Sequence, residues 1–355
     1  SKVAQYATVY YEYDSDGRVT NQRMATGQEN TYTYQEGYNE LDSRSKYRLK
    51  TTETRGDGSV QITYVNSYGQ PLLSELKESA HASESSLNYY QYDGSGNLIE
   101  HATPSALTGY SVNGDFTITP LYKSEGGQYN VGLIHVYDYY DETTTGSGGS
   151  AVKGLKQYDK IKHGRDGTPI KLRKYEYTQA SYTMTLGGSS SSSSSSSSSE
   201  SDDTFDVFAY PLAKEIRYRN EDGTGAIETS YRYTWHPGTV QMLERVTTFP
   251  AVPPSQNGSG IPATRAERFD ESGNLVWTKD ERGTISYNEY DATRNLTRSV
   301  QDVDEAQLTL PDGWSTPTDG GKHLVTDYEY DARGRQIQTL GPEHNVDGQT
   351  VRRAS

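Results

Sequence analysis

The sequence predicts an all-β protein in which β-hairpins join into a long, twisted antiparallel sheet. Two observations lead to this prediction: an excess of tyrosine over the other aromatic residues, and a short motif that recurs along the chain. The 355 residues include 31 Tyr but 5 Phe and 3 Trp. Tyrosine suits a half-buried strand because its ring packs against neighbouring side chains while its hydroxyl group stays hydrated.

The motif reads Tyr-x-Tyr-Asp-x-x-Gly, followed by Arg or Asn and then an apolar residue. Two copies are complete, with the key residues Tyr11, Tyr13, Asp14 and Gly17, and Tyr90, Tyr92, Asp93 and Gly96. A third copy has one extra residue before its apolar position, with Tyr328, Tyr330, Asp331 and Gly334. Two degenerate copies contain Phe269, Asp270 and Gly273, and Tyr290 and Asp291 without the glycine.

The chemistry of this motif predicts one β-hairpin per copy. Tyrosines two positions apart lie on one face of a strand, because successive side chains of a strand point to opposite faces. The aspartate can accept hydrogen bonds from turn N–H groups, and the glycine supplies the positive φ angle at which the chain reverses. Asp270 and Asp291 are 21 residues apart, and Asp291 and Asp331 are 40 apart, which indicates a repeat of about twenty residues.

Weaker patterns complete the secondary-structure prediction. Tyr68 with Gly69, and Tyr158 with Asp159, are interpreted as further worn copies of the motif. Helical periodicity is scarce, and its best candidate is the stretch 72–86, in which Leu72, Leu76 and Ala80 have suitable spacing.

Composition predicts that one array of repeats is interrupted by loops. We expect a repeat region at 1–186, a flexible serine-rich loop at 187–203, and a continuation of the same array at 204–355. Insertions rich in proline or glycine fall at 250–262 and 310–321 within the second region.

Charge argues against several classes of partner. The formal net charge of -14 disfavours nucleic acid, whose phosphates require clustered Lys and Arg, and it disfavours anionic membrane surfaces. No apolar run approaches the ~18 residues of a membrane span, so no membrane insertion is predicted.

The absence of cysteine excludes disulfides and thiolate-bound metals. The chain opens at Ser1 without a leader sequence, as a processed piece or fragment would.

The sequence predicts no catalytic residue, no metal site and no cofactor. The seven histidines are scattered, and none has the spacing of a metal-binding motif. Asp14 and Asp16 resemble the start of a calcium loop, but Arg18 stands where the loop needs an oxygen ligand. Arg55-Gly56-Asp57 resembles an adhesion tripeptide, although such a string also arises in an ordinary turn.

The recurring Tyr-x-Tyr-Asp-x-x-Gly copies resemble those of the YD-repeat proteins, which include bacterial Rhs elements, the cocoon components of Tc toxin complexes and the teneurin shell. The resemblance implies hairpins joined in a sheet that spirals into a hollow shell, commonly around a toxic C-terminal domain. The family's Asp-Pro-x-Gly segment is missing. The nearest string, Leu340-Gly341-Pro342-Glu343, does not match it, so self-cleavage is not carried over to any residue here.

The function expected from this pattern is architectural. We expect an exported bacterial protein, extracellular or on the cell surface, that forms part of a β-sheet shell or an extracellular fibre. One alternative is the wall of a toxin-enclosing cocoon whose effector domain lies outside this chain, and a second is an adhesin that binds a surface glycan or receptor. Open sheet edges require pairing, so the predicted partners are further repeat segments of the same or identical chains.

Overall fold

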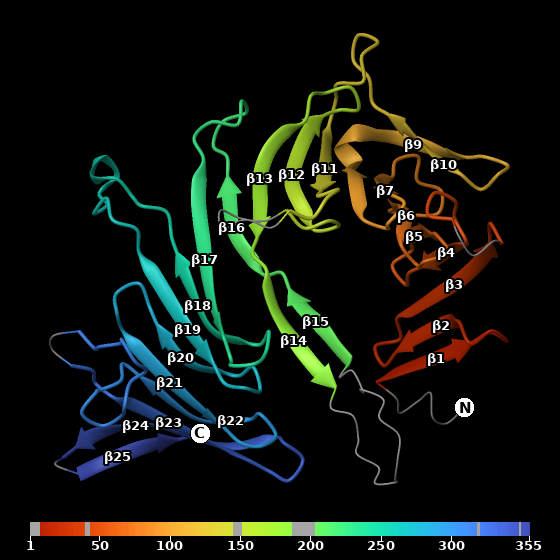
Figure 1. Ribbon diagram of the computed structural model, residues 1–355. Helices are drawn as coiled ribbons and strands as arrows, with labels where there is room; N and C mark the ends of the chain where they lie inside the picture. The colour runs from red at the N-terminus through yellow and green to blue at the C-terminus, as the bar shows by residue number, and fades with distance from the viewer. Residues whose placement is uncertain (1–7, 40–42, 145–150, 187–202, 318–319, 348) are drawn as a thin grey trace, which may run out of the picture. The chain divides into compact units, whose positions relative to one another are not determined.

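The structure is a computed structural model that describes residues 8–39, 43–144, 151–186, 203–317, 320–347 and 349–355. It confirms the all-β prediction, since strands account for nearly all of its regular structure (Figure 1). Among these residues, twenty-one strands belong to one sheet and two further pairs form separate hairpins. The strands of the large sheet pair antiparallel. The predicted serine loop lies outside the described residues, apart from Asp203.

The chain divides into two compact units, which are described separately. The first comprises Ser1–Thr143, Ala151–Lys174 and Arg217–Ala226, and the second comprises Thr144–Ser150, Tyr175–Ile216 and Ile227–Ser355.

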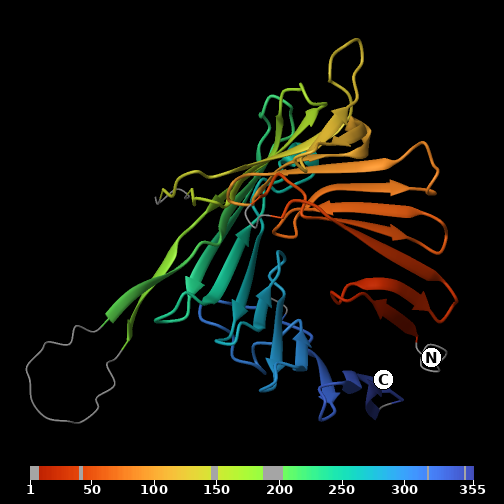
Figure 2. The same ribbon diagram turned by 90° about the vertical axis from the view of Figure 1, so that its right-hand side faces the viewer.

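Strands of the first unit follow one another across the sheet in chain order, except where β9 and β10 intervene (Figure 2). Its elements are β1 (Val9–Tyr13), β2 (Val19–Met24), β3 (Glu29–Glu36), β4 (Leu49–Thr54), β5 (Val60–Val65), β6 (Pro71–Lys77), β7 (Ser86–Tyr92), β8 (Leu98–Ala102), η1 (Pro104–Ala106), β9 (Leu107–Val112), β10 (Ile118–Tyr122), β11 (Leu133–Tyr139), β12 (Lys156–His163) and β13 (Ile170–Tyr177), which continues into the second unit.

The second unit repeats this meander from β17 to β25, with each strand pairing antiparallel with the next. Its elements are β14 (Ala180–Leu186), β15 (Asp203–Ala209), β16 (Leu212–Arg217), β17 (Ile227–Trp235), β18 (Met242–Thr248), η2 (Pro254–Gln256), β19 (Thr264–Phe269), β20 (Leu275–Lys279), β21 (Ile285–Tyr290), β22 (Leu296–Gln301), β23 (Leu324–Tyr330), β24 (Gln336–Val346) and β25 (Gln349–Ala354).

The helix predicted at 72–86 is wrong, because β6 and the start of β7 occupy this stretch. Leu72 and Leu73 are both buried, and β6 pairs with β5 on one side and β7 on the other. Pairing on both edges of β6 outweighs a weak helical spacing, since residues whose burial is decided by tertiary packing do not follow local periodicity.

The core of the first unit lies beneath the β9–β10 hairpin, which forms a second layer over part of the sheet. Leu107 and Ile118 of the hairpin are buried with Tyr64, Leu73 and Ile134 of the sheet. Hydrogen bonds also fix this layer, because the Tyr110 hydroxyl donates to Glu75 over 2.9 Å and the Tyr122 hydroxyl donates to Glu100 over 3.1 Å. Lys77 and Lys162 pair with those two carboxylates.

A smaller core in the second unit forms where the segment between β22 and β23 folds over the sheet. Ile285, Val300 and Val303 are buried, and Leu310 and Trp314 pack against them. The predicted 310–321 insertion therefore contributes apolar side chains to a core.

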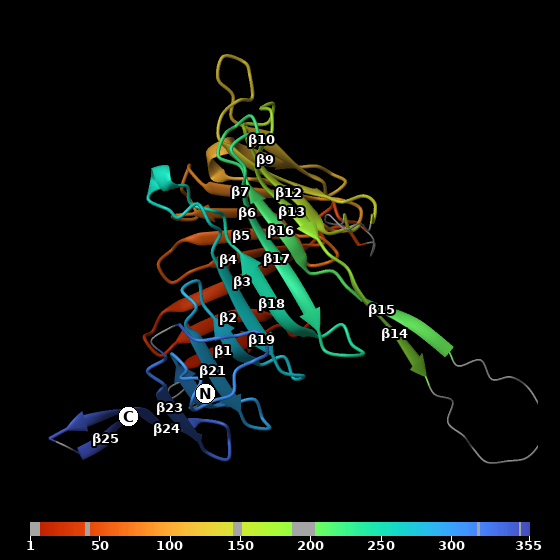
Figure 3. The same cartoon turned by 60° about the vertical axis from the view of Figure 1, so that its left-hand side comes forward.

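The β14–β15 hairpin projects from the second unit beyond β16–β18, as Figure 3 shows. Tyr182 pairs with Val207, and Met184 pairs with Phe205, so four apolar side chains share one face of the ribbon. Tyr182, Met184 and Phe205 are exposed.

Candidate functional site

The five motif aspartates make the same three hydrogen bonds in their turns. In each copy Oδ1 accepts the backbone N–H groups two and four residues later, and Oδ2 accepts a side-chain N–H from the residue four positions later. The donor–acceptor distances lie between 2.7 and 3.0 Å for Asp14, Asp93, Asp270, Asp291 and Asp331.

This geometry explains why the motif has Arg or Asn after its glycine, a preference whose reason the sequence reading missed. Both side chains have an N–H group that reaches back to the turn carboxylate. The donors are Arg18, Asn97, Asn274, Asn295 and Arg335. A carboxylate with three donors forms charge-assisted bonds that hold the turn closed.

The backbone of each turn is a three-residue hairpin loop ending in a left-handed residue. In the first copy the N–H of Asp14 donates to the Arg18 carbonyl, the N–H of Gly17 donates to the Asp14 carbonyl, and Gly17 has φ 78°. In the copy without glycine, Arg294 takes this conformation at φ 66°. A side chain is disfavoured there, so the other turn bonds hold Arg294 in place.

One turn of this kind was not predicted from the sequence. Asp280 accepts the N–H groups of Arg282 and Thr284, with Gly283 at φ 87°. Its signal was the spacing of Asp to Gly, which stands here without the preceding tyrosine pair. The worn copy interpreted at Tyr68 and Gly69 does form such a turn, in which Asn66 takes the place of the aspartate and accepts the N–H groups of Tyr68 and Gln70.

One interpreted copy is wrong. Tyr158 and Asp159 lie inside β12, where they pair with β11 and β13, and no turn follows them directly. The string matched the motif in residue type alone, since Gly164 and the aspartate are five positions apart, against three in the complete copies.

The return strand of each motif copy carries a β-bulge just after the turn. Tyr92 pairs with Leu98, and Gln91 pairs with Glu100, so Ile99 is an extra residue between them. The same offset recurs in the other copies, at Thr20, Leu72, Val276, Thr297 and Ile337. A bulge leaves backbone groups out of the regular ladder and increases the strand twist.

The bulge also corrects the reading of the third motif copy. No residue is inserted before its apolar position, because Gln336 pairs with Tyr330 as Leu98 pairs with Tyr92. Ile337 is the bulged residue and is 63% exposed.

Tyrosine hydroxyls link several strands to the strand that precedes them in the sheet. The Tyr92 hydroxyl donates to the carbonyl of Pro71, and the Tyr330 hydroxyl donates to the carbonyl of Leu296, over 3.0 and 2.9 Å. In every case the acceptor is the first residue of the preceding strand, next to its bulge where one is present. The other pairs are Tyr34 with Val19, Tyr139 with Leu98, Tyr233 with Leu212 and Tyr290 with Leu275. We call this contact the tyrosine clasp.

The clasp places a tyrosine beside the preceding turn aspartate. Burial, followed by the negative charge of Asp93, raises the pKa of Tyr139. Burial and the charge of Asp14 likewise raise the pKa of Tyr34. The hydroxyls therefore stay protonated at neutral pH and act as donors.

The remaining tyrosines of the motif differ in their surroundings. Tyr13 and Tyr11 belong to β1 and are 59% and 42% exposed, so they pack less than the sequence pattern suggested. Tyr328 and Phe269 are half-buried on β23 and β19. Tyr90 stacks on His101, with ring centroids 4.7 Å apart and an interplanar angle of 10°.

His101 also stacks on His135, which lies directly opposite it on β11, with centroids 5.6 Å apart. The chain leaves the sheet after β8 to form β9 and β10, then returns as β11 beside β8. This excursion brings together two histidines that are 34 positions apart in the sequence. Burial, and then the neighbouring His135 ring, lower the pKa of His101.

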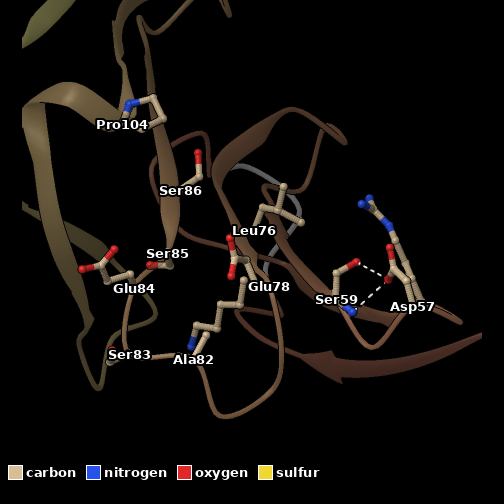
Figure 4. A pocket seen from close by; sticks show the side chains of 12 residues that line it. Asp57, Ser59, Leu76, Glu78, Ala82, Ser83, Glu84, Ser85, Ser86 and Pro104 are labelled. Carbon is tan, nitrogen blue, oxygen red and sulfur yellow. Dashed lines mark hydrogen bonds between the residues drawn. The ribbon is translucent and has the colours of Figure 1, made fainter.

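A groove of about 790 Å³ opens beside the β4–β5 turn (Figure 4). Arg55, Asp57 and Ser59 line it together with Leu76 and Glu78. Both Arg55 and Asp57 of the adhesion-like tripeptide therefore line the same groove. Asp57 accepts the N–H and hydroxyl groups of Ser59, and Arg55 donates to Glu53, so both side chains serve the local turn.

Asp14 and Asp16, which resembled the start of a calcium loop, both form ion pairs with Arg18 over 2.8 Å. Arg18 therefore competes with a calcium ion for these carboxylates. Among the described residues, no group of three or more His, Asp or Glu side chains could hold a metal ion. Within the same residues, no helix is long and apolar enough to cross a membrane.

The sequence matches no protein-family profile and no curated protein. Solved structures that match this chain include a crystal structure of TcdB2-TccC3-Cdc42, with 11% identity and a TM-score of 0.31 over 96% of this chain and 17% of that chain. Another is a structure of a Photorhabdus luminescens Tc holotoxin pore with a TccC3 mutation, with 13% identity and a TM-score of 0.30 over 94% of this chain and 16% of that chain. This chain thus spans less than a fifth of either.

The clasp predicts a stability loss when one hydroxyl is removed. Tyr92→Phe keeps the ring but deletes the donor to Pro71, and we expect it to lower the free energy of unfolding by about 1 kcal/mol. Chemical denaturation followed by circular dichroism measures this change. Tyr13→Phe is the matched control and should leave stability unchanged, because Tyr13 is 59% exposed. Equal effects of the two substitutions would contradict the clasp.

The turn carboxylates predict a loss of stability in acid. Hydrogen bonds from the Thr293 hydroxyl and from Asn295 lower the pKa of Asp291 from 3.8 to about 2. A lowered folded-state pKa stabilises the fold above the unfolded value, and this stabilisation is lost as pH falls. We therefore expect stability to decline between about pH 4 and pH 2.

Thermal unfolding across this range measures the decline, with Asp291→Asn as the paired variant. The difference in melting temperature between the variant and the unaltered chain should shrink as the pH falls from 4 to 2. A difference that stays constant over that range would show that ionised Asp291 does not stabilise the turn.

Proposed function

We propose that this chain is a structural β-sheet segment, part of a shell wall or a fibre, and that it has no catalytic role. The observation that supports this most strongly is the repeated pairing of turn aspartate and tyrosine clasp. These side chains carry most of the recurring sequence signal. The aspartates bond to turn N–H groups and to the Arg or Asn side chain four residues later, and the clasp tyrosines bond to backbone carbonyls. They join strand to strand and hairpin to hairpin.

The outermost strands indicate how the sheet would extend. Within the described residues, β1 pairs in register only with β2, and β25 only with β24. Val9 and Tyr11 are exposed on β1, and Val351 is exposed on β25. Unpaired N–H and C=O groups beside apolar side chains favour the addition of another strand.

The partners in this proposal are further repeat segments of the same or identical chains. A wall that encloses a toxin domain encoded elsewhere is one form of the proposal. An exported protein at the outside of a bacterial cell suits either form, because an extended, edge-paired sheet serves as a container or a fibre.

Sedimentation of the purified chain over a range of concentrations, with electron microscopy of the same samples, tests the proposal. We expect concentration-dependent assembly into closed particles or filaments. Val351→Lys places a charge on the exposed face of β25 and should reduce this assembly. Val252→Lys is the matched control, because Val252 is 49% exposed in the loop between β18 and β19.

A compact monomer at every concentration would contradict the proposal. Assembly that Val351→Lys leaves unchanged would show that β25 is not the edge in use.

A further inference from the structure

The His101–His135 pair takes no part in the turns or the clasps. The two residues face each other in register across β8 and β11. Directly opposed residues of an antiparallel pair have Cβ atoms about 4.5–5.5 Å apart. The two rings stack at an interplanar angle of 17°, so their in-plane lone pairs meet at one ion when the His135 ring turns about its side-chain bonds. Both rings are half-buried, so solvent reaches the pair.

The surroundings of His101 match those of a metal ligand. The Asn88 amide oxygen lies 2.9 Å from His101 Nε2. An amide oxygen can only accept a hydrogen bond, so Nε2 carries the proton and Nδ1 has a free lone pair. Metal-binding histidines almost always donate their second ring N–H to a carbonyl or carboxylate, which fixes the orientation of the ring. Tyr90 stacks on the same ring and restrains it further.

We propose that His101 and His135 together bind one divalent transition-metal ion of the class that prefers imidazole. His101 contributes Nδ1, His135 contributes a ring nitrogen, and Asn88 positions His101 from outside the coordination sphere. Water completes the coordination. Imidazole ligands suit copper, zinc and nickel, and copper binds most tightly in this series.

The location gives such an ion a structural consequence. Strands β8 and β11 are neighbours in the sheet but are separated in the chain by η1, β9 and β10. A bound ion would cross-link them at the point where the hairpin meander is interrupted. A ligand that binds only the folded state stabilises it, so the ion would strengthen this joint. This inference does not depend on assembly or on the proposed wall.

Cupric ion is the probe for the test, added to the untagged, chelator-treated full chain at pH 7.5. We expect one tightly bound ion per chain, an electron paramagnetic resonance spectrum with hyperfine splitting from two imidazole nitrogens, and a raised melting temperature. His101→Asn and His135→Asn should each remove the two-nitrogen signal and weaken binding more than the loss of the outer-shell partner Asn88 does.

Two further variants distinguish the loss of a metal ligand from a general loss of folding. Asn88→Ala keeps both ligands and should weaken binding by about tenfold. His163→Asn is the matched control, since His163 is exposed on β12, and should bind as the unaltered chain does. Circular dichroism in the presence of chelator checks that each variant is folded.

A one-nitrogen spectrum in the unaltered chain would overturn the proposal, whatever the variants do. Retention of the two-nitrogen signal in both ligand variants would overturn it equally. If the ligand variants fail to fold, the spectrum of the unaltered chain and the affinity of Asn88→Ala decide the matter.

Discussion

The turn carboxylate is the interaction on which the rest of this sheet depends. One aspartate accepts two backbone N–H groups and one side-chain N–H, and so fixes both the length of the loop and the register of the strands it joins. A fixed loop places the bulge at the same offset in each copy, and the bulge lies next to the carbonyl that receives the clasp from the following hairpin. Loop, bulge and clasp therefore form one unit.

The combination of loop, bulge and clasp stabilises a long sheet that has few buried side chains. The cores lie where an insertion covers the sheet, under the β9–β10 hairpin and under the segment between β22 and β23. Elsewhere the sheet is held by ladder hydrogen bonds, turns, clasps and half-buried tyrosines. The strands at either end of the meander leave backbone groups for the further strand that the proposed function requires.

The sequence predicted the fold because its turns are local, whereas most of the rest depends on distant contacts. Asp93 and Gly96 define a hairpin within five residues, so the pattern could be read directly. The Arg or Asn partner was visible in the motif, but its bond to the aspartate was not foreseen. The clasp and the His101–His135 pair join residues far apart in the sequence, and no spacing rule reveals them. The helix predicted at 72–86 and the motif copy interpreted at Tyr158 were wrong, because a short pattern does not show which strands pair.

Turn and clasp should stabilise the sheet together, and a double-mutant cycle between Asp93→Ala and Tyr139→Phe measures their coupling. Tyr139 donates to Leu98, the first residue of the strand after the Asp93 turn. We expect a coupling free energy of about 1 kcal/mol, measured by chemical denaturation of the two single variants and the double variant. Asp93→Ala combined with Tyr290→Phe, whose clasp belongs to another turn, should be additive. Additivity of Asp93→Ala with Tyr139→Phe would show that the turn and the clasp stabilise the sheet independently.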